Sequence, residues 1–315
     1  MKIPHLTIGN ITVPYPIIQG GMAVRISGGR LAGTVAKAGG VGVIAGTALT
    51  EAELLTEMEK AKNIANGTGA IGINVLFAVS NFADLIRTAM KNGIDMVFSG
   101  AGFSRDVFSW GREFNVPVVS IVSSGRLAKL AEKLGAAAVV VEGKEAGGHL
   151  GTDRPLKDIL PEVVGQVKVP VIAAGGIITG KDIKWALDNG ADGVQMGTRF
   201  AASEESDAPE SFKQTYLDAS KEDSILIESP VGLPGRALKT AFTERLDKGL
   251  IKPTVCNSCL KKCSNRFCLR LALEDAQKGL MQDGLIFAGE KVHTIKEILP
   301  VQKIFHNLIS ELRQD

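Results

Sequence analysis

Residues 169–198 have the sequence VPVIAAGGIITGKDIKWALDNGADGVQMGT. The stretch begins with a short apolar run that ends in a glycine pair. Helical periodicity follows over residues 181–189, and Gly190 stands where a helix C-cap is expected. A second apolar run covers residues 193–196. Strand, helix and strand in this order predict one βαβ unit with two parallel strands.

The same rhythm extends from Ile17 to about Ala202. We predict strands at 17–19, 42–45, 70–75, 96–99, 118–122, 138–142, 169–173 and 193–196. Helical stretches lie between them, among them 51–65, 81–92, 126–134 and 181–189. Eight strands with intervening helices in roughly 200 residues are typical of a (β/α)8 barrel, whereas a doubly wound sheet more often has about five to seven strands. We therefore expect an α/β protein built on a (β/α)8 TIM barrel.

The composition excludes several classes of protein. The 315 residues include 36 Lys and Arg against 34 Asp and Glu, so the formal net charge is +2 and no nucleic-acid partner is expected. Hydrophobic residues make up 45%, which is enough for a sizeable core. No segment reaches the roughly 18 consecutive apolar residues of a membrane span, and the first residues lack the apolar core of a signal peptide. We expect a cytoplasmic protein without a membrane partner.

After Ala202 the strand–helix rhythm breaks. We expect residues 1–202 to form the barrel and residues 203–315 to form a C-terminal extension packed on it. A helix is predicted over residues 269–278 of this extension.

All four cysteines of the chain lie in the extension, within residues 256–268. They are Cys256, Cys259, Cys263 and Cys268, with the spacing C-x2-C-x3-C-x4-C. Four thiolates suit zinc or an iron–sulfur cluster. Structural zinc more often uses two separated C-x2-C pairs, so the compact array favours a 4Fe-4S cluster, with zinc as the alternative. Free or disulfide-bonded cysteines stay open. A metal centre here would anchor the extension or carry electrons.

Glycines follow the last two predicted strands, at Gly175 and Gly176 and again at Gly197, which Thr198 follows. In (β/α)8 barrels a phosphate site commonly forms after strands seven and eight. Glycine lets the backbone approach phosphate oxygens, and a threonine adds a hydroxyl donor. The alternative is that these glycines only make tight turns. Together the two pairs predict a phosphate-bearing cofactor.

The loop after the sixth predicted strand has the sequence EGKEAGGHLG over residues 142–151. It presents His149 among small residues, close to Glu142 and next to Gly147 and Gly148. With its usual pKa of roughly 6.5, a histidine in such a loop can exchange a proton near neutral pH. His149 is thus predicted as a general acid or base. A surface histidine without a catalytic role is the alternative.

Three other strand ends are suited to a flat ring. Gly21 and Met22 lie in a QGGM turn, where paired glycines admit a ring and methionine packs beside it. Asn74 ends the GINV strand, and its amide can donate to and accept from a heterocycle. Ser99 and Gly100 begin an SGAG segment that exposes backbone.

Six motifs carry a resemblance to a known family. They are QGGM, AGGVG at residues 38–42, GINV, EGKEAGGHLG, AAGGI and MGTRF, in this order. With them the sequence resembles the FMN-dependent nitronate monooxygenases and type II enoyl-acyl-carrier-protein reductases over residues 10–245. The better-known members lack the four cysteines. The resemblance implies FMN at the barrel mouth, and His149 matches the active-site histidine. The expected cofactor-binding residues are Gly21, Met22, Asn74, Ser99, Gly100, Glu142, Gly147, Gly148, Gly175, Gly176, Gly197 and Thr198.

The EAGGH phrase is similar to the reductase form of the motif. We therefore expect an FMN-dependent oxidoreductase that reduces the activated C=C bond of enoyl thioesters in fatty acid biosynthesis. NAD(P)H would be the electron donor, acyl-carrier protein the partner, and a homodimer is allowed. The alternative is a nitronate monooxygenase of the 2-nitropropane dioxygenase type, which would oxidise small nitroalkanes or nitronates with FMN and oxygen. A third hypothesis is a binding protein without catalytic activity, whose fold is stabilised by a bound metal.

Overall fold

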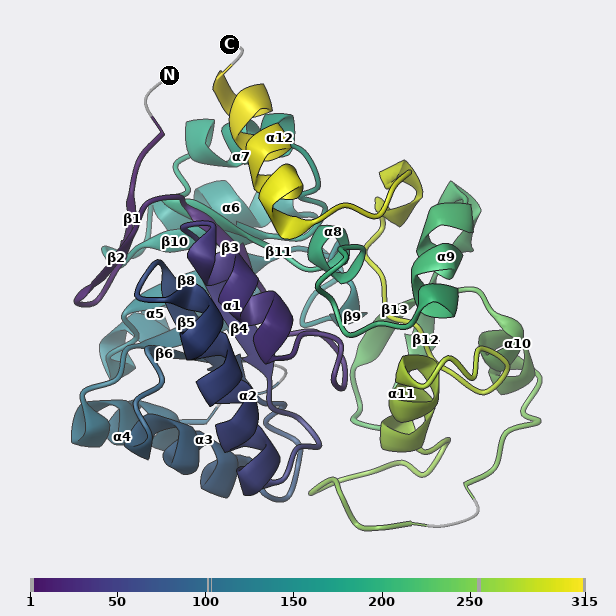
Figure 1. The fold of residues 1–315 in the computed structure, drawn as a ribbon. Helices are drawn as coiled ribbons and strands as arrows, with labels where there is room; N and C mark the ends of the chain where they lie inside the picture. Colours follow the sequence, from purple (N-terminus) through teal and green to yellow (C-terminus); the bar gives the residue numbers. More distant parts are fainter. Residues whose placement is uncertain (1–2, 101, 103, 254–255, 314–315) are drawn as a thin grey trace.

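A computed structural model describes residues 3–100, 102, 104–253 and 256–313 of the chain. Eight parallel strands form a closed barrel in the order β10-β11-β3-β4-β5-β6-β7-β8 (Figure 1). They are β3 (Ile17–Gln19), β4 (Val41–Ala45), β5 (Ala70–Asn74), β6 (Met96–Ser99), β7 (Val118–Val122), β8 (Ala138–Glu142), β10 (Val171–Ala174) and β11 (Gly193–Met196). All eight predicted strands are confirmed, and the TIM-barrel prediction is confirmed with them.

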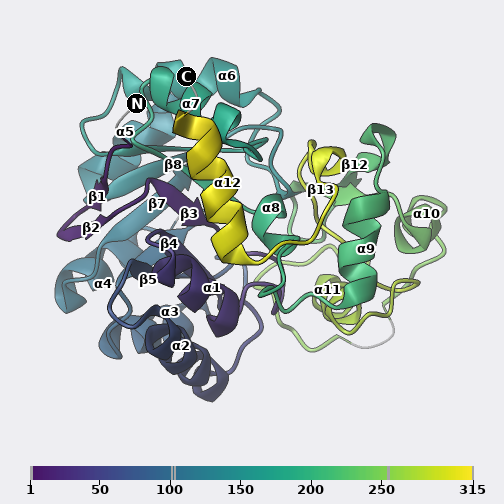
Figure 2. The same ribbon diagram turned by 45° about the horizontal axis from the view of Figure 1, so that its top comes forward.

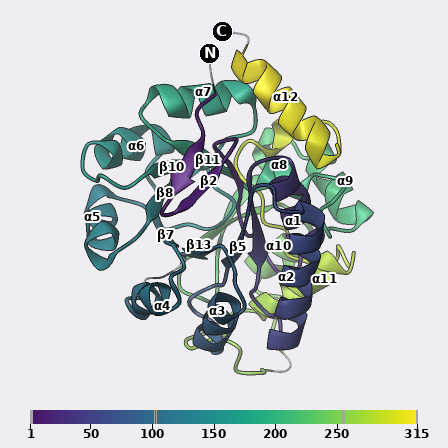
Figure 3. The same cartoon turned by 60° about the vertical axis from the view of Figure 1, so that its left-hand side comes forward.

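Seven helices each follow one barrel strand and surround the barrel (Figure 3). They are α1 (Gly29–Lys37), α2 (Glu51–Ala65), α3 (Phe82–Lys91), α4 (Asp106–Phe114), α5 (Gly125–Leu134), α6 (Leu156–Val164) and α7 (Gly180–Asp188). The local sequence determines where some of these helices begin and end. A capping box of Thr179 and Asp182 begins α7, and Gly190 follows its C-cap with a φ of +88°. No helix in the described part of the chain is long and apolar enough to cross a bilayer.

The eighth place in the helix ring is taken by the last helix of the chain. After β11 only a single turn follows, α8 (Thr198–Ala201), whereas α12 (Val301–Arg313) packs against α7 and α1 (Figure 2). Phe305 on its buried face lies with its ring centroid 5.9 Å from that of Phe200. Glu311 accepts a hydrogen bond of 2.7 Å from the first N–H of α7, at Gly180. The end of the predicted extension thus lies within the ring, and a division of the chain at residue 202 stays a prediction.

Between α8 and α12 the chain forms a separate group of elements beside the barrel mouth (Figure 1). They are α9 (Glu210–Asp218), the 3-10 turn η1 (Lys221–Asp223), β12 (Ser224–Glu228), β13 (Pro234–Leu238), α10 (Ala241–Asp247), α11 (Leu269–Gln277) and the 3-10 turn η2 (Val292–Thr294). The helix predicted at 269–278 is therefore confirmed as α11. A short strand from the β8–α6 loop, β9 (Gly148–His149), pairs antiparallel with β13. This pairing joins the barrel loop that carries His149 to the added elements.

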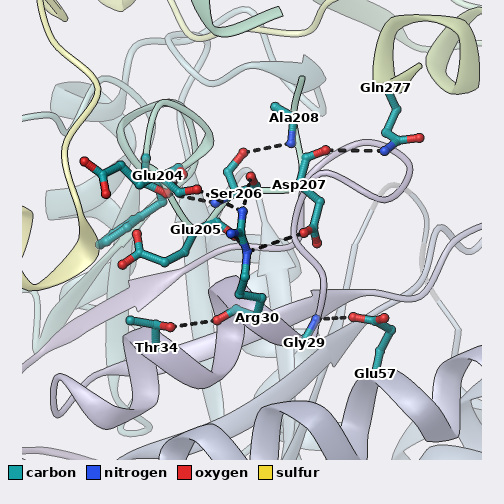
Figure 4. Close-up of polar contacts among 12 residues, drawn as sticks. Gly29, Arg30, Thr34, Glu57, Glu204, Glu205, Ser206, Asp207, Ala208 and Gln277 are labelled. Carbon is teal, nitrogen blue, oxygen red and sulfur yellow. Dashed lines mark hydrogen bonds and ion pairs between the residues drawn. The ribbon is translucent and has the colours of Figure 1, made fainter. Parts of the chain in front are cut away.

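A polar joint holds the chain after α8 to the start of α1 (Figure 4). The guanidinium of Arg30 donates to the carbonyls of Glu204, Glu205 and Ser206 at 2.9–3.1 Å. Its Nε also lies 3.7 Å from the carboxylate of Asp207. Five N–H donors in a rigid fork allow one arginine to satisfy several carbonyls at once.

The end of the barrel opposite its mouth is covered by a β-hairpin. The hairpin consists of β1 (Leu6–Ile8) and β2 (Ile11–Val13), and it packs on residues of the barrel interior.

The close approach of α1 to β4 depends on a missing side chain. A Cβ added to Gly42 would lie 1.9 Å from the carbonyl oxygen of Ala32. We expect Gly42→Ala to lower the free energy of unfolding by about 3 kcal/mol or more, because helix and strand would have to move apart. Urea unfolding followed by far-UV circular dichroism measures the change. The matched control is Gly165→Ala, where the nearest atom would be 3.7 Å from the new Cβ. An equal loss in both variants would contradict the packing argument.

Candidate active site

A cavity of about 520 Å³ opens at the carboxyl ends of the barrel strands. The structure brings almost all of the residues expected at a cofactor site to its wall. The lining includes Gly21, Met22, Asn74, Gly100, Glu142, Gly147, Gly148, His149, Gly175, Gly176, Gly197 and Thr198. Ser99 does not line it, because its side chain is 4% exposed within β6, where it pairs with Ser120 of β7. Ala101 of the SGAG segment lies outside the described residues.

Nine glycines line this cavity, so much of its wall is bare backbone. A Cβ on Gly147 would lie 2.6 Å from the carbonyl carbon of Ala288, and one on Gly21 would lie 2.7 Å from Cβ of Asn74. Larger residues would therefore displace neighbouring segments. Asn74 donates from Nδ2 to the carbonyl of Phe98 at 3.0 Å, which fixes the orientation of its amide. A smooth wall with one oriented amide is suited to a flat heterocycle.

One end of the cavity is suited to phosphate. Gly175 and Gly176 follow β10 with φ of +104° and +70°, and Thr198 begins α8. The Thr198 hydroxyl accepts a hydrogen bond of 2.9 Å from the N–H of Gly289. Lys291 also lines the cavity here, and its Cε would be 3.6 Å from a Cβ added to Gly176. A cation beside glycine backbone and a hydroxyl forms the donor set that phosphate prefers.

Sequence analysis missed Gly289 and Lys291. Both follow strand β13 and helix α11 by many residues and belong to no βα repeat. The local signal is the short phrase AGEK at residues 288–291, which resembles many surface turns.

His149 is held at the cavity by the added elements. Its Nε2 lies 2.8 Å from the hydroxyl of Ser229, in the turn between β12 and β13. Its ring meets Phe287 edge-on, with centroids 5.2 Å apart. Burial lowers the pKa of His149 to about 4, so the imidazole is neutral at pH 7. The expected proton exchange near neutral pH assumed an ordinary pKa, and desolvation of the ring moves the pKa out of that range.

Glu142 shows the opposite shift at the end of β8. Glu142 lines the cavity, and burial raises the pKa of its carboxyl group to about 7. Desolvation penalises the charged form of an acid and of a base alike, which moves their pKa values in opposite directions. Glu142 is therefore a cavity side chain whose protonation changes near neutral pH.

One of the four cysteines lies at the cavity, and the four are not gathered into a metal site. Cys259 lines the cavity, whereas Cys256 and Cys263 are exposed and Cys268 is half-buried. Burial and the neighbouring Cys268 raise the pKa of the Cys259 thiol. Among the described His, Cys, Asp and Glu side chains, no group of three or more converges closely enough to hold a metal ion. The donor set of four free thiols suits zinc or iron, so the predicted metal centre stays a prediction.

Comparison with known sequences places the chain in a family. The family model described as nitronate monooxygenase matches residues 5–98 and 80–311. A (3aS,4S,5R,7aS)-5-hydroxy-7a-methyl-1-oxo-octahydro-1H-indene-4-carboxyl-CoA dehydrogenase of Mycobacterium tuberculosis is 31% identical, over 76% of this chain and 67% of the relative. A probable nitronate monooxygenase of Staphylococcus saprophyticus is 28% identical, over 79% of this chain and 82% of the relative.

Solved structures agree with the sequence matches. FabK from Thermotoga maritima superposes with a TM-score of 0.85 at 29% identity, covering 96% of this chain and 94% of that one. Nitroalkane oxidase from Streptomyces ansochromogenes gives a TM-score of 0.80 at 25% identity, over 95% and 96% of the two chains. The chain therefore belongs to the nitronate monooxygenase family of flavin-dependent oxidoreductases.

Proposed function

We propose that this protein is an FMN-dependent reductase of enoyl thioesters, of the enoyl-acyl-carrier-protein reductase type used in fatty acid biosynthesis. The observation that carries the proposal is the neutral His149 beside Ser229 at the glycine-lined cavity. With its pKa lowered to about 4, the neutral imidazole of His149 is a weak base, while its ring N–H can donate a hydrogen bond to a carbonyl. The Mycobacterium tuberculosis relative, whose name describes a carboxyl-CoA dehydrogenase, supports a thioester substrate.

The residues of the cavity fit FMN. Its phosphate would lie on Gly175, Gly176, Gly197 and Thr198, with Lys291 supplying positive charge. Its ring would lie against the backbone near Gly21, Met22 and Asn74. Bound FMN would supply the hydride for the β-carbon of the enoyl group. His149 would donate a hydrogen bond to the thioester carbonyl, and Glu142, protonated in part at pH 7, would provide the proton for the α-carbon.

The second candidate function is nitronate monooxygenase activity on a small nitroalkane or nitronate. The Staphylococcus saprophyticus relative and the Streptomyces ansochromogenes oxidase support it. In that reaction His149 would remove a proton from the nitroalkane carbon. A pKa of about 4 makes His149 a weak base for this step, which favours the reductase.

Four further expectations belong to the same proposal. NAD(P)H would reduce the flavin, and acyl-carrier protein would deliver the substrate. The chain could act as a homodimer. The four cysteines Cys256, Cys259, Cys263 and Cys268 would hold a 4Fe-4S cluster, or zinc as the alternative.

Substrate assays separate the two functions. We expect anaerobic NAD(P)H oxidation that depends on crotonyl-CoA, with oxygen-dependent turnover of nitroethane much slower. His149→Ala should lower thioester turnover by about 100-fold or more and leave FMN bound, because in this proposal the ring would contact the substrate and not the FMN phosphate. Flavin absorbance of the purified variant verifies the binding. Nitroethane turnover without thioester turnover would overturn the reductase assignment.

The protonation of His149 is measured by NMR titration of its ring C–H signal, assigned by its loss in His149→Asn. We expect a midpoint near 4, because burial disfavours the imidazolium. The folded state then binds protons less readily than the unfolded chain, so His149 makes stability fall as pH drops from 6.5 toward 4. A midpoint between about 6 and 7 would show that the ring is solvated.

Lys291 tests the phosphate end. We expect Lys291→Gln to weaken FMN binding about tenfold, since one charge-assisted contact to phosphate would be lost. Quenching of flavin fluorescence during titration of the apoprotein measures the dissociation constant. Lys184→Gln is the matched control, because Lys184 pairs with Asp188 of α7 as Lys291 pairs with Asp182 of the same helix. Equal affinities in the two variants would remove Lys291 from the site.

A further inference from the structure

The segment that contains the cysteines, residues 256–268, is bound to the barrel side of the cavity rim. We call it the cysteine segment. The N–H of Ser80 donates to the carbonyl of Cys259 at 3.0 Å, and the N–H of Lys261 donates to the carbonyl of Ala78 at 2.8 Å. The Ser80 hydroxyl also donates to the carbonyl of Ser258 at 2.8 Å. These bonds attach the cysteine segment to the loop between β5 and α3, so that residues 257–260 line the cavity.

The same segment is bound to the turn that positions His149. The N–H of Ser264 donates to the carbonyl of Pro230 at 3.0 Å. Arg266 forms an ion pair with Glu228, at the end of β12. Ser229 stands between these two contacts, and its hydroxyl lies 2.8 Å from Nε2 of His149. The cysteine segment therefore holds both neighbours of the residue that contacts the imidazole.

The cysteine segment makes a third contact at its end. We call its contacts to the β5–α3 loop, to the β12–β13 turn and to Phe242 the three anchors. Phe267 is 1% exposed and packs edge-on against Phe242, with ring centroids 5.6 Å apart. The cysteines are spread among these contacts. Cys256 precedes the contacts to the barrel, Cys259 accepts one of them through its carbonyl, Cys263 lies between Lys261 and Ser264, and Cys268 follows Phe267.

The cysteine segment has little structure of its own. Within residues 256–268 the only regular element is a single β-bridge, from Leu260 to Val79, and most side chains are exposed. A surface segment without a core is ordered at a cost in chain entropy, which a multidentate metal offsets by closing the loop.

We propose that the four thiolates bind one metal centre that prefers sulfur ligands, and that this centre holds together the two sides of the cavity rim, the loop between β5 and α3 and the turn between β12 and β13. We call this linkage the clasp. Drawing four sulfur atoms to about 2.3 Å from zinc or iron would fix the three anchors relative to one another. It would hold the wall at residues 257–260 and, through Pro230 and Glu228, the hydroxyl of Ser229. Ser229 is then a positioning residue for His149, and loss of the metal loosens the site. The inference rests on the metal centre and the role of His149 in the proposed function.

Metal analysis of the full-length, anaerobically purified protein is the first test. We expect one zinc ion or about four iron ions per chain. Cys263 and Cys268 do not line the cavity, and we expect the variants Cys263→Ser and Cys268→Ser to lose most of the bound metal. The matched control is Ser264→Ala, because its contact to Pro230 uses only the backbone. A metal-free wild type, or one with disulfide-bonded cysteines, would overturn the metal centre.

Hydrogen exchange with mass spectrometry tests the clasp itself. In Cys263→Ser we expect exchange at least tenfold faster in peptides that cover residues 77–81 and 258–264, with unchanged exchange in β7 and β8. Unchanged β7 and β8 show that the barrel is folded. A variant that loses the metal without faster exchange at the rim would overturn the clasp, whatever substrate the enzyme uses.

The effect of the metal centre on His149 is tested by enzyme kinetics and by the NMR titration of its ring. Metal loss should raise KM for crotonyl-CoA and move the NMR titration midpoint of His149 upward, because a loosened rim admits water. FMN content should stay unchanged, which separates failure of the clasp from failure of the flavin site. Ser229→Ala should produce the same change in the His149 midpoint with the metal retained, and Ser229→Thr should restore it. A midpoint that both Cys263→Ser and Ser229→Ala leave unchanged would overturn the positioning role.

Discussion

The antiparallel pairing of β9 with β13 is the contact on which the site depends. Strand β8 delivers Glu142 to the cavity as in any parallel barrel, but the following loop leaves the barrel and adds a strand to the sheet of β12 and β13. The N–H of Leu150 donates to the carbonyl of Pro234 at 2.9 Å, and Arg236 donates from Nε to the carbonyl of Lys144 at 3.0 Å. These bonds bring His149 to Ser229 and bury part of its ring. Without them the loop would be an ordinary mobile connection with a solvated histidine.

Much of the barrel could be predicted because its signals are local. Apolar runs bounded by glycine marked all eight strands, and the carboxyl ends of parallel strands converge, so residues at those ends met in one cavity. Ser99 is the exception. Successive strand residues point to opposite sides, and residue type alone did not reveal which side Ser99 takes. The position of α12 also lacked a local signal, because its partners α1 and α7 lie more than 100 residues earlier.

The chemistry of the site was harder to predict than its location. Lys291 and Ser229 come from irregular segments whose sequences resemble many other turns. The opposite pKa shifts of His149 and Glu142 have one cause, burial by elements distant in sequence, and no pattern around either residue carries that information. The cysteine spacing indicated the number of thiol donors. It could not indicate that the segment between them bridges the two sides of the rim.

The place of α12 has a consequence for the order in which the protein forms. A ribosome releases the seven other helices of the ring, the eight barrel strands and the described residues that line the cavity before it releases residues 301–313. Until then α1 and α7 leave an apolar gap between them, which Phe305 and Leu308 later fill. During synthesis the barrel would therefore expose this apolar gap until α12 is made and packs into it. A chaperone that covers this gap during synthesis would act after the barrel strands have been made and before α12 packs against α1 and α7.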